Sequence, residues 1–319
     1  MSGIVYFASL LQVGAALNDV SLPSNDDTCR AFFLREMARK CNELSLETAY
    51  FENASGLTQK SRISTSDLTK IALEALKYPV LARIWSEVES EIEITGPNAR
   101  KEKLVHAYKK YIKSWPDFVK KNKFLGGKGG SLYYTKQKIS ARCHVLVSEV
   151  EGQKILITFT GARYDDDAFA YDEEMLSMAR AMLRGEKPLP GEKLKELEEK
   201  GGAFEFLTLT GKKIRYKSAY ADVPHLPAST TKILAVLCML DHVQDLSAKL
   251  TVRQSDIVGG SGFKCHAGDE LTYEDAIRAL MLPSSNTIAN SVASNVGALL
   301  LEKTLKNRKT AEISGCQAK

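Results

Sequence analysis

Residues 225–240, HLPASTTKILAVLCML, place a serine at the entrance of an apolar segment. Ser229 and Lys232 form the pattern S-x-x-K, and one turn of helix would put both side chains on the same face. The N-terminus of such a helix offers free N–H groups and partial positive charge to an oxyanion. A lysine in a partly buried site can lose its proton and act as base toward the hydroxyl. Taken alone, the pattern more often marks a helix cap beside a solvated lysine.

Composition indicates a globular protein without pointing to a function. The 319 residues suffice for one large domain or two ordinary ones. The net charge of +5 is concentrated in residues 100–123, where nine Lys or Arg residues accompany two acidic ones. This aromatic-containing stretch could bind an anionic polymer, but a solvated helix face over core aromatics is the simpler interpretation. We therefore expect no nucleic-acid partner.

The sequence also argues against several other classes. Six cysteines and five histidines are scattered without a C-x-x-C pair, so neither a zinc site nor a disulfide framework is expected. No apolar run reaches ~18 residues, which argues against a transmembrane helix. Residues 1–20 have an apolar centre but no preceding basic residue, so we interpret them as an amphipathic helix rather than a secretory signal. Compartment and oligomeric state are not readable.

Hydrophobic spacing and turn residues predict a mixed α and β chain. Two β-rich runs about a turn predict a hairpin over residues 141–162, and a second hairpin is predicted over 203–219. Residues 184–202 are charged and punctuated by proline and glycine, as is typical of a linker. The tail after residue 302 is polar, so we expect it to fray. Helical spacing predicts helices over residues 28–45, 63–76, 172–183, 273–282 and from about 287.

Two further short motifs could serve the same site as Ser229. Ser284 and Asn286 form S-x-N on a connector between two predicted helices, where a hydroxyl and an amide could act together. Helix capping is the alternative interpretation. Residues 128–130, KGG, place a cation beside a strand that lacks side chains, so a substrate could pair with the strand edge.

Two of the three motifs occur twice in the chain. A second S-x-x-K spans residues 261–264, inside a glycine-rich loop where nothing fixes its geometry. A second KGG spans residues 200–202 and is more simply the C-cap of a helix. Context therefore favours Ser229 and Lys128 over the repeated copies.

Together, PASTTK, SSN about 55 residues later and a K-x-G strand resemble the motifs of the penicillin-binding serine transferases. The chain is most similar to the D-alanyl-D-alanine carboxypeptidases. Residues 265–297, CHAGDELTYEDAIRALMLPSSNTIANSVASNVG, resemble the stretch around the family's second motif. Residues 32–57, FFLREMARKCNELSLETAYFENASGL, resemble its segment that ends in F-x-N-x-x-GL.

The order of the segments differs from the order in the family. The family runs from the first and second motifs to F-x-N-x-x-GL, the third motif and a final helix, whereas this chain starts just after the second motif. The resemblance therefore implies a circularly permuted α+β fold of the β-lactamase/transpeptidase-like type, with an antiparallel sheet flanked by helices and an all-helical subdomain. The implied parts are an extension (1–29), the C-terminal part of the domain (30–185), a charged linker (186–202), the N-terminal part (203–298) and a tail (299–319).

The resemblance implies a role for each residue of the first two motifs. Ser229 would attack the carbonyl between the last two D-alanines of a peptidoglycan stem peptide and form an acyl-enzyme. Lys232 would take its proton. Ser284 would pass a proton to the leaving amine, and Asn286 would orient the substrate amide and Lys232. No cofactor or metal is implied, and β-lactam antibiotics are expected ligands.

The third motif agrees with the family only in part. Lys128 would bind the terminal carboxylate beside Gly130, and the N–H groups of Ser229 and Ser131 would form the oxyanion hole. Gly129 stands where the family has threonine or serine, so a carboxylate-binding hydroxyl is missing, for which Ser131 could substitute. Residues 133–140, YYTKQKIS, are also longer and more basic than the family's turn.

Two alternatives to a carboxypeptidase stay open at this point. A β-lactamase-like hydrolase needs a general base for fast hydrolysis of the acyl-enzyme, and the sequence shows no suitably placed E-x-x-x-N element. A non-catalytic binding module would keep the fold without turnover. The family acts outside the cytoplasmic membrane. Residues 1–20 do not have the features of a secretory signal, so the compartment stays open.

Overall fold

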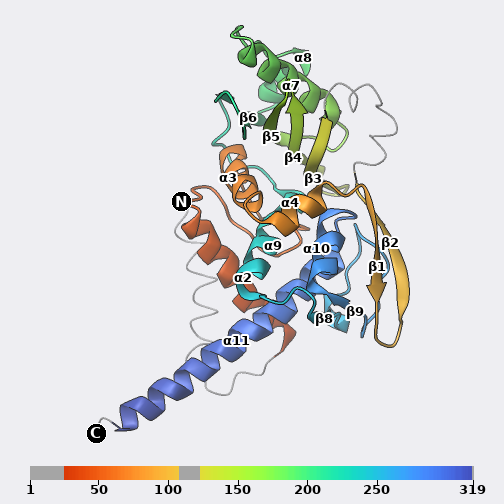
Figure 1. Cartoon of the computed structure of the whole chain (residues 1–319), viewed down its shortest axis with the longest axis vertical. Helices are drawn as coiled ribbons and strands as arrows, with labels where there is room; N and C mark the ends of the chain where they lie inside the picture. The colour runs from red at the N-terminus through yellow and green to blue at the C-terminus, as the bar shows by residue number, and fades with distance from the viewer. Residues whose placement is uncertain (1–24, 108–122, 318–319) are drawn as a thin grey trace.

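A five-stranded antiparallel sheet organises the fold (Figure 1). The computed structural model describes residues 25–107 and 123–317. Both predicted hairpins are confirmed, because β4 pairs with β5 and β6 pairs with β7. The expected architecture of an antiparallel sheet flanked by helices is thus present. The strand order is β3–β4–β5–β6–β7, with bounds Lys123–Tyr134, Ile139–Val150, Gln153–Ala162, Ala203–Thr208 and Arg215–Lys217.

The sheet joins strands from distant parts of the chain. β5 pairs antiparallel with β6 from Ile155↔Thr208 to Thr160↔Ala203, although about forty residues separate the two strands in sequence. The β4–β5 hairpin is tight: Glu151 and Gly152 both have positive φ (50° and 75°), as a two-residue turn of type I′ requires. β3 lies at one edge of the sheet and pairs with β4 alone among the described strands.

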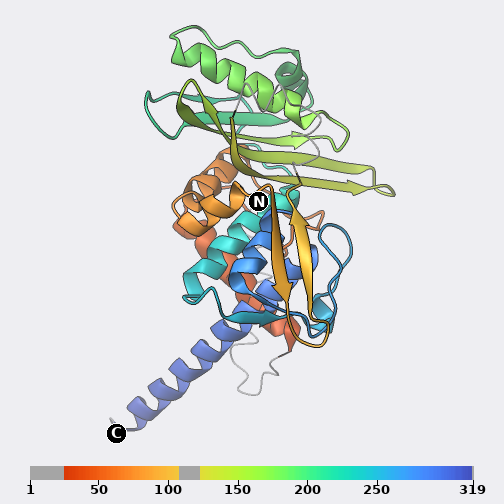
Figure 2. The same cartoon turned by 45° about the vertical axis from the view of Figure 1, so that its right-hand side comes forward.

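Helices cover both faces of the sheet (Figure 2). Strand alternation sends Ile157 and Phe159 of β5 to one face, where they pack against α7 and α8. It sends Thr158 to the other face, where its hydroxyl lies 2.6 Å from that of Thr69 in α3. The helices have the bounds α2 Asp26–Glu43, α3 Thr65–Ala75, α4 Pro79–Trp85, α7 Ala168–Leu183, α8 Glu192–Glu199, α9 Thr231–His242, α10 Tyr273–Met281 and α11 Asn286–Gln317.

The larger core surrounds α9, below the sheet in Figure 1. Residues 231–239 of this helix are all buried, as expected of a central helix that is apolar on every side. We expected this part of the molecule to be all-helical. It also holds two small antiparallel sheets, so the expectation is wrong. One pairs β1 (Glu89–Ile94) with β2 (Arg100–Val105), and the other pairs β8 (Lys249–Thr251) with β9 (Glu270–Thr272).

The interpretation of residues 100–123 as a helix face is wrong for the part that the structure describes. Residues 100–105 form β2, in which Leu104 is buried and the charged residues alternate toward solvent. Lys101 and Lys103 pair there with Glu91 and Glu89 across the hairpin. The alternation has period two, which is the period of a strand. Residues 108–122 and the predicted amphipathic helix over 1–20 lie outside the described residues.

Two segment boundaries also differ from the expectation. α7 begins at Ala168 rather than at 172, because the Asp167 side chain accepts hydrogen bonds from the backbone N–H groups that follow and caps the helix. The predicted linker contains α8, whose Leu194 and Leu197 are fully buried against the sheet layer. The expected C-cap over residues 200–202 is confirmed: Lys200 is the C-cap residue of α8, and Gly201 has a φ of +82°.

The C-terminal segment continues as helix rather than fraying after residue 302. α11 runs to Gln317 and projects beyond the rest of the molecule at the lower left of Figure 1. Its first half lies beside α2, the first described helix (Figures 1 and 2). Their backbones touch: a Cβ on Gly297 would lie 1.8 Å from the carbonyl oxygen of Cys29. Within the described residues, α11 included, no helix has the length and apolarity needed to cross a membrane.

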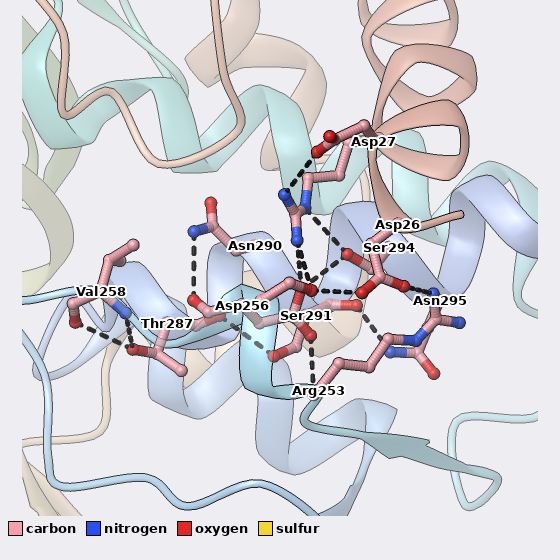
Figure 3. Close-up of polar contacts among 12 residues, drawn as sticks. Asp26, Asp27, Arg253, Asp256, Val258, Thr287, Asn290, Ser291, Ser294 and Asn295 are labelled. Carbon is pink, nitrogen blue, oxygen red and sulfur yellow. Dashed lines mark hydrogen bonds and ion pairs between the residues drawn. The ribbon is translucent and has the colours of Figure 1, made fainter.

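A polar network holds the junction of α2, α11 and residues 253–258 (Figure 3). At its centre Asp256, fully buried, accepts hydrogen bonds from Ser294 at 2.6 Å and from Arg30 at 3.2 Å. Its backbone carbonyl accepts a hydrogen bond from Asn290. Arg253 pairs with Asp26, the first residue of α2. The first described helix, α2, is therefore held against the last one, α11.

Candidate active site

The candidate nucleophile lies on a strained turn before α9. Ser229 is the middle residue of a single 3₁₀ turn, Ala228–Thr230. Ala228 is fully buried and has a φ of +47°, a conformation that costs a non-glycine residue free energy and is often found at functional sites. Gly56 makes room for this turn, since a Cβ there would lie 1.8 Å from the Ala228 carbonyl oxygen. The segment FENASGL therefore packs directly against the serine turn.

Lys232 is completely buried and contacts three oxygen atoms. Its Nζ lies 2.9 Å from Ser229 Oγ, 2.8 Å from Asn286 Oδ1 and 2.7 Å from the carbonyl oxygen of Ser55. Burial, together with the charge of Lys128, lowers the pKa of Lys232 well below its usual value. No carboxylate in the described part of the chain forms an ion pair with it.

An ammonium could donate one N–H to each of these three oxygen atoms, but the lowered pKa of Lys232 favours the neutral amine. The carbonyl oxygen of Ser55 can only accept hydrogen bonds, and so can Asn286 Oδ1, because Asn286 Nδ2 donates to Gly259. A neutral amine has two N–H groups for these two acceptors. Its lone pair is then free to accept the proton of the Ser229 hydroxyl. The arrangement can therefore convert that hydroxyl into a nucleophile.

A second buried lysine approaches the site from strand β3. Lys128 Nζ donates to Ser284 Oγ at 2.9 Å and to the Gly129 carbonyl oxygen at 2.6 Å. Burial lowers the pKa of Lys128 to about 7. His106 is also buried there; burial, reinforced by the charge of Lys128, lowers the pKa of His106 to about 4, so this ring is neutral at pH 7. Ser284 itself has a φ of +64°, a second strained residue at the site.

The backbone of β3 lies against the serine turn. A Cβ on Gly130 would lie 2.9 Å from Ser229 N and 2.8 Å from the Pro227 carbonyl oxygen, so no larger residue fits there without movement. Gly129 follows Lys128 on the same strand, and Ser131, the residue after Gly130, has an exposed side chain. On its outer side β3 pairs with no strand of the described chain, so its backbone there is available to an extended ligand.

The structure thus brings the sequence-predicted residues into two adjoining groups. Ser229, Lys232 and Asn286 form one hydrogen-bonded group, and Lys128 and Ser284 form the other. Gly129 and Gly130 connect them along β3, whereas Ser131 lies on the same strand opposite Arg142 of β4, with its side chain exposed. Two buried lysines without acidic partners in the described chain are unusual, and such groups are concentrated at functional sites.

Sequence reasoning missed the backbone that supports these side chains. The carbonyl oxygen of Ser55 holds Lys232, and that of Gly259 holds the amide of Asn286. The backbone N–H of Asn286 donates to Ser261, so the loop with the second S-x-x-K uses its backbone rather than its hydroxyl here. The FENASGL segment was a visible signal for Ser55, but main-chain contacts leave no residue type to recognise.

One comparison with known proteins found a match over part of the chain. Residues 191–314 match the model of the family described as the Beta-lactamase enzyme family, a range that includes the S-x-x-K and S-x-N motifs. The match supports a serine hydrolase of the serine β-lactamase and penicillin-binding-like superfamily, and the mixed fold with its antiparallel sheet agrees with that class. Searches of curated proteins and of solved structures each found no match.

Proposed function

We propose that this chain is a serine-type D-Ala-D-Ala carboxypeptidase that removes the terminal D-alanine from peptidoglycan stem peptides through an acyl-enzyme on Ser229. The observation that carries the proposal is the 2.9 Å contact between Ser229 Oγ and a buried Lys232 whose pKa is lowered. Penicillins would acylate the same serine. The alternative interpretation of Ser229 as a plain helix cap fits poorly, because its backbone turn is strained and its hydroxyl meets a buried amine.

In the proposed reaction, Ser229 Oγ attacks the carbonyl carbon of the penultimate D-alanine while Lys232 accepts the hydroxyl proton. Collapse of the tetrahedral intermediate breaks the C–N bond, and a proton delivered through Ser284 leaves with the amine of D-alanine. Water then attacks the ester, restores the Ser229 hydroxyl and releases the shortened peptide. The backbone N–H groups of Ser229 and Ser131 would stabilise the oxyanion in both steps.

Lys128 would bind the terminal carboxylate, and Asn286 would hold the substrate amide and Lys232. A charged Lys128 attracts an anion strongly in a buried site, where water screens little. Within the described residues, no carboxylate hydrogen-bonds to Ser229 or Lys232, so we find no dedicated base for rapid deacylation. This observation favours a peptidase that retains penicillin over a β-lactamase.

We also propose that the chain order is a circular permutation of the family's order. Two contacts support it. The β5–β6 pairing completes one sheet from the two halves of the chain, with residues 186–202 lying between them in sequence. The contact of Gly297 with Cys29 brings together the positions that would be consecutive in the family's order. The parts would then be 30–185 and 203–298, as the resemblance implies.

The proposed activity is tested by measuring two reactions with the same protein. The wild type is expected to release D-alanine from a peptide that ends in D-Ala-D-Ala and to turn over benzylpenicillin slowly, with the Ser229→Ala variant inactive in both. A peptide ending in D-Ala-L-Ala serves as the control substrate. Rapid penicillin turnover without D-alanine release would establish the β-lactamase alternative, and inactivity of the folded wild type in both assays would establish a binding module.

The acylation rate should depend on pH through Lys128. Its amine must carry a proton to bind a carboxylate, and the pKa of this amine is lowered to about 7, so kcat/KM for penicillin acylation should fall as the pH rises above about 7. Lys232 must instead be neutral, so its titration gives the opposite, rising limb. The control is the methyl ester of the same penicillin, which lacks the carboxylate. An equal alkaline decline with the ester would contradict the role of Lys128.

Restoring the hydroxyl of the third motif should improve capture of carboxylate ligands. Gly129→Thr is expected to raise kcat/KM for penicillin acylation by about tenfold, since one hydrogen bond to a charged group contributes roughly 1.5 kcal/mol or more. Gly129→Ala adds a Cβ without the hydroxyl and is the matched control. If both variants acylate at the wild-type rate, the missing hydroxyl does not limit binding.

A further inference from the structure

A short turn over residues 53–57, NASGL, contacts the candidate site at two points. The carbonyl oxygen of Ser55 lies 2.7 Å from Lys232 Nζ. Gly56 lies so close to the serine turn that a Cβ there would be 1.8 Å from the Ala228 carbonyl oxygen. The conformation of residues 53–57 therefore determines where one acceptor of the Lys232 amine is placed.

The side chain of Asn53 closes this turn with three hydrogen bonds. Its Oδ1 accepts the backbone N–H of Gly56 at 2.8 Å and the hydroxyl of Ser55 at 3.1 Å. Its Nδ2 donates to the Leu57 carbonyl oxygen at 3.3 Å. An asparagine that bonds to the main chain following it stabilises a turn locally, without contacts from other segments. One side chain thus fixes the whole of the turn.

A single peptide group connects Asn53 with the amine of Lys232. The Gly56 N–H and the Ser55 C=O belong to the same peptide unit, which is planar and trans, so the two groups point in opposite directions. The hydrogen bond from the Gly56 N–H to Asn53 consequently sets the direction of the Ser55 carbonyl oxygen toward Lys232. Among the described residues, Asn53 forms no hydrogen bond with Lys232 itself.

We propose, on the basis of the carboxypeptidase function above, that Asn53 is a positioning residue for Lys232. It holds the Ser55 carbonyl oxygen in place as one of two acceptors for the neutral amine, the other being Asn286 Oδ1. With both N–H groups engaged, the amine directs its lone pair to Ser229 Oγ, 2.9 Å away. Because proton transfer depends on the alignment of the reacting groups, a Ser55 carbonyl released from its turn would slow acylation.

Removing the Asn53 side chain should slow the chemical step without weakening the binding of penicillin. For Asn53→Ala, the acylation rate constant at saturating benzylpenicillin is expected to fall about tenfold, the effect of losing one orienting hydrogen bond. The penicillin concentration that gives half of the maximal rate should stay close to the wild-type value. Asn53→Ser keeps an uncharged oxygen that can accept the Gly56 N–H, so it should recover most of the rate.

A double-mutant cycle separates the positioning of Lys232 from a general effect on the fold. The Lys232→Met protein has no amine to orient, so adding Asn53→Ala should leave its residual acylation rate unchanged. A purely structural role would slow both backgrounds alike. Gln59→Ala is the matched control, because it removes from the same segment an amide that forms no hydrogen bond within the described ranges. This variant should acylate at the wild-type rate.

The outcomes distinguish this proposal from the catalytic one. If the wild type is acylated on Ser229 but Asn53→Ala reacts equally fast, or slows both backgrounds alike, Asn53 does not position Lys232 while the catalytic proposal stands. Urea unfolding shows whether Asn53→Ala is folded. If it is not, Asn53→Gln, whose longer side chain misplaces the acceptor, replaces it in the cycle with the same expected loss. A folded wild type that is not acylated overturns both proposals.

Discussion

Replacing Lys232 with methionine is expected to slow acylation of Ser229 by about 10²- to 10⁴-fold, the usual contribution of a positioned general base. Methionine preserves much of the buried volume but has no group that can accept the Ser229 proton. Lys232→Arg should lose activity to a similar degree, because a guanidinium keeps its proton. The measurement is the rate of adduct formation with a labelled penicillin, followed by intact mass at several pH values.

The second S-x-x-K copy supplies a matched control for this prediction. Lys264 is exposed and lies in the loop beside Asn286, so Lys264→Met removes a lysine from the same neighbourhood without touching the proposed base. Its acylation rate should equal that of the wild type. The rising limb of the pH profile should also vanish only in the Lys232 variants. A Lys232→Met protein that stays folded and acylates at the wild-type rate would show that another group activates Ser229.

Replacing Asp256 with alanine should cost about 3 kcal/mol of unfolding free energy, the low end for breaking a buried ion pair. The change would leave the Arg30 guanidinium and the buried Ser294 hydroxyl without their shared acceptor. We place the effect at the low end because the Arg30 side chain retains 23% of its exposure and can regain some water. The measurement is urea unfolding followed by circular dichroism. The slope of the unfolding free energy against urea concentration is compared between variant and wild type, to detect changes in the unfolded state.

Asp27 is the matched control for Asp256. It pairs with the same arginine at 3.2 Å, but its side chain is 91% exposed, so Asp27→Ala should change stability little. The comparison also tests the integration of α2, which the permuted order requires to be part of the domain. Equal, small effects of both substitutions would mean that α2 contributes little to the folded structure and would weaken the proposal of a permutation.

The local sequence predicted those parts of the fold that one segment determines. The hairpins over 141–162 and 203–219 follow from β-rich runs about turn residues, and the helix over 273–282 follows from its apolar spacing. α8 was missed because only Leu194 and Leu197 face the sheet, and two apolar residues in a charged segment resemble a linker. Its burial depends on strands that lie elsewhere in the sequence.

The candidate site likewise combines features that a single segment determines with features that depend on distant segments. The side chains of Ser229, Lys232, Ser284 and Asn286 belong to short motifs, so the sequence could nominate them. Their hydrogen-bond partners include main-chain oxygen atoms of residues 55 and 259, which any residue type could provide. The strained φ of Ala228 was also unreadable, because alanine gives no indication of a left-handed conformation. Such features appear only when distant segments are packed together.

The central claim is that Ser229 becomes covalently acylated, and peptide mapping of penicillin-treated protein tests it most directly. The wild type is expected to gain the mass of one penicillin, with the modification on the peptide that contains Ser229. The Ser229→Ala variant should gain none. An unmodified wild type that is folded, or an adduct on Ser261 or Ser284 instead, would contradict the account.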